Sequence, residues 1–210
     1  MRRLRSAVIL LLLIPMDVAA QARPATGWTA VPSVGFGWLG RRWSGGTDGN
    51  TVTLGPGPFA QFAVGVGYRT AGRTTYEFQA ALTPTEFGAD IETDSVPSRA
   101  AGVGRVNVVR AQAGILHRLR PTVPGYFSAG AGMIYLHVVR PFANWEQENE
   151  LAPSAHVGAG YDASSGTSTI RLDARLHLTR GMNTVFAPIG PLEPRFAADF
   201  IFSVGYLIGL

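Results

Sequence analysis

The feature that most constrains this chain is a strict alternation of apolar and polar residues, which recurs along most of its length. From Ile170 to Leu178 every even-numbered residue is apolar, while the odd-numbered positions carry Arg171, Asp173, Arg175 and His177. Successive side chains of a β-strand point to opposite faces, so a period of two predicts a strand with one apolar and one polar face. The segments 59–69 and 200–210 repeat the pattern.

We predict eight strands, near residues 31–43, 58–70, 74–86, 103–118, 125–139, 154–163, 168–180 and 196–210. Short connections at 70–74, 119–125 and 163–167 alternate with long ones at 44–57, 87–102, 140–153 and 181–195. This alternation is typical of membrane barrels, in which short turns face the periplasm and long loops face outside. The predicted fold class is an all-β, eight-stranded antiparallel up-and-down transmembrane β-barrel. In the fourth strand the segment Val106 to Arg110 shifts the alternation by one, so we expect a β-bulge there.

The first 22 residues have the pattern of a cleaved signal peptide. Three arginines among the first five residues precede the apolar run Ala7–Ile14, and Ala20-Gln21-Ala22 offers cleavage after Ala20 or Ala22. The apolar run is too short to cross a bilayer, which needs about 20 residues. We therefore expect a signal peptide at 1–22, a barrel at 23–210 and a bacterial cell outer-membrane location.

The two faces of the strands differ in a way that predicts which one lies inside. The polar face is rich in glycine, for example at Gly65, Gly67 and Gly130, and an eight-stranded barrel is only just wide enough for side chains. The apolar face carries many aromatic rings, which would overfill that lumen. We therefore predict that the apolar face meets lipid. An aromatic girdle is expected near the short turns, formed by Tyr68, Tyr76, Phe127, Tyr161 and Tyr206.

Composition excludes several classes of site. The chain has no cysteine, which excludes disulfides, thiolate metal sites and cysteine nucleophiles. Its 18 basic residues are all arginine, and without residues 1–22 there remain 15 arginines against 13 acidic residues. No basic run accompanies this small excess, so we expect no nucleic-acid partner.

Four segments carry a resemblance to a known family. They are Gly125-Tyr-Phe-Ser-Ala-Gly-Ala-Gly132, His156-Val-Gly-Ala-Gly-Tyr-Asp162, Arg171-Leu-Asp-Ala-Arg175 and the alternating C-terminal strand. Together they resemble the small eight-stranded outer-membrane barrels of the OmpA/OmpX type and the porin-like outer-membrane β-barrel domain families. The resemblance implies insertion by the barrel-assembly machinery, which reads a last strand that usually ends in Phe or Trp. This chain ends in Leu210 and departs from that pattern.

The polar face also carries the candidate functional residues. With the apolar face outside, the charged residues Arg69, Glu77, Arg110, Asp162, Arg171, Asp173, Arg175 and Asp199 point into the lumen, four of each sign. Buried charges must pair, so we predict a structural network of salt bridges, extended by Gln79, Gln112 and His177. OmpA-type barrels hold a comparable network that resembles a gate. We predict no catalytic residues, no metal and no cofactor.

The function predicted is a non-enzymatic, structural or surface-interaction role through the four long loops. The expected protein is a monomer in contact with outer-membrane lipid and lipopolysaccharide. One alternative is a lipid-modifying enzyme of the lipid A deacylase kind, for which His177, Thr179 and Asp173 are the nearest match to a catalytic set. Two others are a small gated pore and a soluble periplasmic barrel that binds a ligand.

Overall fold

The computed structural model describes residues 26–40, 43–47, 50–56, 58–93, 98–119, 124–140, 145–146, 149–165, 168–180, 184–186, 190–194 and 196–210. The predicted signal peptide lies outside these residues. Within them, no helix is long and apolar enough to cross a membrane.

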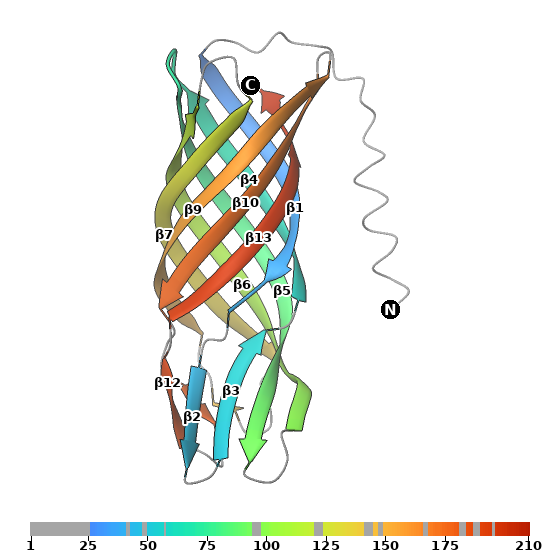
Figure 1. Ribbon diagram of the computed structural model, residues 1–210, viewed down its shortest axis with the longest axis vertical. Helices are drawn as coiled ribbons and strands as arrows, with labels where there is room; N and C mark the ends of the chain where they lie inside the picture. The colour runs from blue at the N-terminus through green and yellow to red at the C-terminus, as the bar shows by residue number, and fades with distance from the viewer. Residues whose placement is uncertain are drawn as a thin grey trace.

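Eight strands form a closed antiparallel wall (Figure 1). They are β1 (Gly27–Trp38), β4 (Pro58–Arg69), β5 (Thr74–Thr93), β6 (Ser98–Arg118), β7 (Gly125–Arg140), β9 (Glu150–Ser165), β10 (Ser168–Arg180) and β13 (Phe196–Tyr206). Each pairs with the next, and β13 pairs back with β1 to close the barrel. The predicted eight-stranded up-and-down barrel is confirmed. Its first strand, however, spans 27–38 rather than 31–43.

The closure has a defined stagger. The hydrogen-bonded register leads from Trp28 through Tyr68, Tyr76, Ile115, Ala129, Val157, Leu176 and Phe200 back to β1 at Trp38. One circuit therefore advances ten residues along β1. With ordinary strand spacings, eight strands and this stagger correspond to a strand tilt of about 40°. The resulting cylinder is narrow, so the side chains that point inward decide whether it is open.

The segments predicted as long loops contain further strands. They hold β2 (Trp43–Thr47), β3 (Asn50–Pro56), β8 (Trp145–Glu146), β11 (Thr184–Phe186) and β12 (Gly190–Pro194). β3 pairs with the far part of β5, and β2, β12, β11 and β8 follow in order, so the wall continues beyond the eight-stranded section (Figure 1). We call this the long-strand end. The opposite, short-turn end carries the β4–β5 turn (Thr70–Arg73), and there β14 (Ile208–Gly209) pairs with β1.

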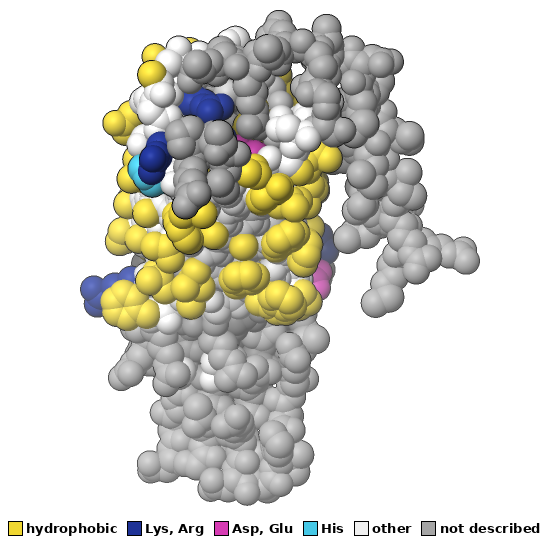
Figure 2. All heavy atoms as spheres, turned by 45° about the horizontal axis from the view of Figure 1, so that its top comes forward, with side chains coloured by type: hydrophobic (Ala, Val, Ile, Leu, Met, Phe, Trp, Pro, Cys, Tyr) yellow, Lys and Arg dark blue, Asp and Glu magenta, His cyan; other side chains and the backbone are white. Residues whose placement is uncertain are grey.

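The outer surface of the eight-stranded section is apolar. Figure 2 shows hydrophobic side chains covering the described outer face as a broad belt. Four of the five predicted girdle residues, Tyr68, Tyr76, Phe127 and Tyr161, are exposed, and Tyr206 is half-buried. Trp28 joins them, with its ring centroid 5.2 Å from that of Tyr68. The apolar face of the strands therefore lies on the outside of the barrel, as predicted.

The expected β-bulge at 106–110 is absent from the described part of β6. Burial alternates without a break from 104 to 112, and Val106 and Val108 point into the lumen. One register shift adjoins the predicted segment, between Arg105 and Val106 in the β6–β7 pairing, but the extra residue is Val139 of β7. Another lies between Phe87 and Ala89 in the β5–β6 pairing. The sequence pattern misled because apolar side chains also face inward here.

Candidate functional site

The lumen is the candidate site, because the structure turns nine predicted residues toward it, namely the eight charged residues and His177. Glu77, Arg110, Asp162, Arg171, Asp173, Arg175, His177 and Asp199 are buried, and Arg69 at the end of β4 is half-buried. Eight of the nine belong to two clusters of charged side chains or lie between them. Arg69 makes no ion pair with any residue that the structure describes.

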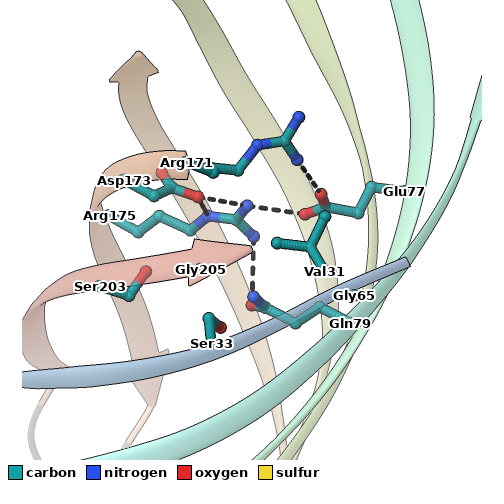
Figure 3. A pocket seen from close by; sticks show the side chains of 10 residues that line it. All are labelled: Val31, Ser33, Gly65, Glu77, Gln79, Arg171, Asp173, Arg175, Ser203 and Gly205. Carbon is teal, nitrogen blue, oxygen red and sulfur yellow. Dashed lines mark hydrogen bonds and ion pairs between the residues drawn. The ribbon is translucent and has the colours of Figure 1, made fainter. Parts of the chain in front are cut away.

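The first cluster is centred on Glu77. One carboxylate oxygen of Glu77 lies 3.0 Å from Nη1 of Arg171, and the other lies 2.6 Å from Nη2 of Arg175. Arg175 also contacts Asp173 at 2.6 Å and donates to the Gln79 amide oxygen at 3.1 Å. Figure 3 shows these side chains converging from β5 and β10 across the barrel. A carboxylate held by two guanidinium groups is among the stronger arrangements for a buried charge.

Asp162 extends the first cluster toward the short-turn end. It accepts hydrogen bonds from Nε of Arg171 at 2.9 Å and from Nη2 of Arg118 at 2.6 Å. Arg118 is buried and faces the lumen, although our prediction omitted it. The available signal was its position, eight residues from Arg110 and therefore on the same face of one strand. The guanidinium of Arg171 also lies over the ring of Tyr126, 5.0 Å from its centroid.

The second cluster joins Arg110 of β6 to Asp199 of β13. Nη2 of Arg110 lies 2.6 Å from Oδ2 of Asp199, and Nη1 donates to the Gln61 amide oxygen at 3.3 Å. Asp199 also accepts the backbone N–H of Gly40 at 2.9 Å, where the chain leaves β1. The cluster therefore connects β4, β6 and β13 with the end of β1.

Two buried histidines lie between the clusters. The rings of His156 and His177 are 5.3 Å apart, on neighbouring positions of β9 and β10. His177 and Thr179 are only 2% and 1% exposed, and Asp173 is engaged with Arg175. The side chains considered for a lipid-modifying enzyme therefore face the lumen, away from the outer apolar surface. The described residues contain no group of three or more His, Asp or Glu side chains placed to hold a metal ion.

Glycines make room for these large side chains. A Cβ at Gly130 would lie 2.5 Å from Cε1 of His156, and one at Gly160 would overlap the Tyr126 hydroxyl. A side chain at either position would displace the ring that occupies the space. The glycine-rich polar face thus reflects the packing of a narrow lumen.

Beyond Arg110, toward the long-strand end, several inward side chains are apolar, and they lie beside the buried Thr83 and Thr85. Val108 lies opposite Leu136 in the register, one inward position beyond the Arg110–Ile134 pair. Val106 on β6 and Phe87 on β5 continue the inward faces of their strands beyond Val108, and all five apolar residues are at most 1% exposed. This corrects the prediction of a purely polar core. The reason is that the closed wall shields its inner face from water, so apolar side chains are as well accommodated there as paired charges.

The polar layer contains a small cavity. A cavity of about 10 Å³ lies beside Glu77 and Arg175, lined also by Ser33 and Ser203 (Figure 3). A volume of this size holds roughly one water molecule. The eight-stranded section therefore contains an ion-paired layer and an apolar layer in series.

The comparison with solved structures shows which fold this is. The outer membrane protein OprG from Pseudomonas aeruginosa superposes with a TM-score of 0.57 over 88% of this chain and 97% of that chain, at 11% identity. The chain has the fold of an eight-stranded outer-membrane β-barrel. At 11% identity the likeness concerns the fold alone.

Two autotransporter domains superpose more loosely. The β domain of the Bordetella autotransporter BrkA has a TM-score of 0.33 at 13% identity, covering 89% of this chain and 100% of that one. The translocator domain of the autotransporter NalP from Neisseria meningitidis has a TM-score of 0.27 at 10% identity, covering 99% and 95%. At these TM-scores neither comparison bears on the fold of this chain. No protein-family model and no curated protein matches the sequence, so the OmpA/OmpX type stays a prediction.

Proposed function

We propose that this protein is a closed, non-conducting scaffold in the bacterial outer membrane that presents its long-strand end to the outside. The observation that carries the proposal is the filled lumen. Ion pairs around Glu77 and Arg110 fill one layer, apolar side chains fill the next, and the cavity beside Glu77 is about the size of one water molecule. We infer that the side chains of these layers leave a hydrated ion no continuous path through the described part of the barrel.

The arrangement of the two ends supports an interaction role outside the cell. In outer-membrane barrels the short turns face the periplasm and the longer connections face outward. Here the outward connections continue the wall as β2, β3, β8, β11 and β12, so they form a sheet rather than separate loops. Binding sites are commonly carried by such connections on a rigid scaffold. The proposal includes contact with lipopolysaccharide through the apolar belt, insertion by the barrel-assembly machinery and a monomeric state.

The test combines location with conductance. The full chain is expressed in a bacterium with two membranes, and the membranes are separated by density. We expect the protein in the outer-membrane fraction, with a gel mobility that changes on heating, as folded barrels show. Reconstituted in a planar bilayer, it is expected to give no steps above the protein-free background.

Each alternative has a distinct outcome in the same set of experiments. Discrete conductance steps would show that the protein is a pore rather than a closed scaffold. Recovery of the protein in the soluble periplasmic fraction would show that the barrel is soluble and does not lie in the membrane. A change in the acyl pattern of lipid A between cells with and without the gene would support a lipid-modifying enzyme.

A further inference from the structure

Among the residues that the structure describes, the charges that face the lumen do not balance once Arg118 is included. Five inward arginines face four inward carboxylates among the residues that the structure describes. The arginines are Arg69, Arg110, Arg118, Arg171 and Arg175, and the acids are Glu77, Asp162, Asp173 and Asp199. A charge withdrawn from water needs a partner of opposite sign. The described lumen thus carries one cation in excess.

The excess lies at Arg69. Its Nε atom is buried and has no hydrogen-bond partner, and the described residues place no carboxylate within ion-pair distance of it. It is close enough to Asp162 and Arg118 for their charges to interact with its own. Asp162, however, already binds both Arg118 and Arg171. Arg69 therefore lies where a further anion would be stabilised.

Two neighbouring hairpins bring other guanidinium groups to the same rim. Arg73, in the β4–β5 turn, donates from Nη1 to the Leu119 carbonyl at 3.3 Å, and the Arg118 N–H donates to the Arg73 carbonyl at 2.9 Å. Figure 2 shows basic side chains and one histidine above the apolar belt at this end, with a small part of an acidic side chain visible beside them. The described acids nearest this rim, Glu77 and Asp162, are buried.

We propose that Arg69, together with Arg73 and Arg118, forms a binding site for a phosphate group at the short-turn mouth of the barrel. Guanidinium groups match the paired oxygens of a phosphate, and the half-buried Arg69 has no ion-pair partner among the described residues. The adjacent outward residues Tyr68 and Tyr76 are exposed rings of the kind found at the level of lipid headgroups. The phosphate belongs either to an anionic phospholipid headgroup or to free inorganic phosphate. This site is separate from the scaffold role.

The first arm of the test uses inorganic phosphate. The folded chain in a zwitterionic detergent is unfolded thermally at increasing phosphate, with chloride adjusted to hold ionic strength constant. A ligand that binds only the folded state raises the midpoint. We expect phosphate to raise the midpoint above the chloride control, and Arg69→Gln to weaken the apparent affinity by at least about tenfold. Arg105→Gln is the matched control, because Arg105 is exposed at the other end of β6.

The second arm identifies a lipid source. The chain is placed in nanodiscs of phosphatidylcholine with a minor fraction of phosphatidylglycerol, and retained lipid is measured by native mass spectrometry. Enrichment of phosphatidylglycerol that is lost in Arg69→Gln assigns the site to headgroups. If phosphate raises the unfolding midpoint but phosphatidylglycerol is not enriched, the site binds the free anion. Arg73→Gln, at an exposed turn position, repeats both arms if Arg69→Gln does not fold. The proposal is overturned if neither probe acts beyond its control, or if these variants respond like the parent.

Discussion

Arg110 and Asp199 form a direct ion pair, with Nη2 and Oδ2 2.6 Å apart and side chains 2% and 0% exposed. The two residues are 89 positions apart in the sequence and lie on β6 and β13, which are not neighbours in the wall. The pair therefore crosses the lumen. Because Asp199 also accepts the Gly40 N–H, the contact fixes the end of β1 as well.

Asp199→Asn is expected to destabilise the barrel strongly, because it leaves the Arg110 guanidinium buried without its carboxylate. Breaking one side of a buried pair costs about 3–5 kcal/mol. The double variant Arg110→Met/Asp199→Leu should recover most of the loss, because it removes both charges together. Urea unfolding in lipid vesicles, followed by tryptophan fluorescence, measures both. A single variant as stable as the parent would contradict a stabilising role for this pair.

Arg175→Ala is expected to destabilise the barrel because it deprives Glu77 and Asp173 of a shared partner. The matched control is Arg105→Ala, whose ion pair with Glu86 is 62% and 64% exposed. Exposed pairs contribute no more than about 1 kcal/mol. The unfolding midpoint should therefore fall clearly for Arg175→Ala and remain close to the parent value for Arg105→Ala. Equal shifts would argue against a stabilising network in the lumen.

Opening the ion-paired layer alone is not expected to produce a pore. In Arg171→Ala/Arg175→Ala the first cluster loses two large side chains, but Val108, Ile134 and Leu136 still fill the next layer. Planar-bilayer conductance should stay at background in that variant. It should rise only when Ile134→Ala and Leu136→Ala are added. Conductance from the first variant alone would mean that the apolar layer does not seal the barrel.

A charge in the middle of the outer apolar surface is expected to hinder membrane insertion. Val157 is 56% exposed on β9, between the two ends of the barrel. Val157→Arg should cost about 2–4 kcal/mol if this surface meets lipid, whereas Tyr161→Arg, nearer the short-turn end, should cost about 0–1 kcal/mol for its charge. Folding yield into vesicles, compared at equal lipid concentration, measures the difference. A protein surrounded by water would tolerate Val157→Arg.

The eight strands were predictable because each carries its own signal. Along β10 the alternation from Ile170 to Leu178 is local, and any strand with these residues would separate Arg171 and Arg175 from the leucines. The orientation was also predictable, since glycines such as Gly130 and rings such as Tyr76 suit opposite faces. In β6 the same reasoning failed, because Val106 and Val108 are apolar on the inner face and gave no sign of a buried layer.

The sequence by itself determined the eight strands of the barrel, their two faces and the set of inward charges apart from Arg118. Only the tertiary structure decided which charges meet. Glu77 reaches Arg171 and Arg175, and Arg110 reaches Asp199, across a lumen whose register is fixed by a ten-residue stagger around the whole barrel. Alternation is a property of one strand, whereas the height at which two strands face each other depends on closure of all eight. For that reason only the folded barrel shows that Arg69 has no ion-pair partner among the described residues.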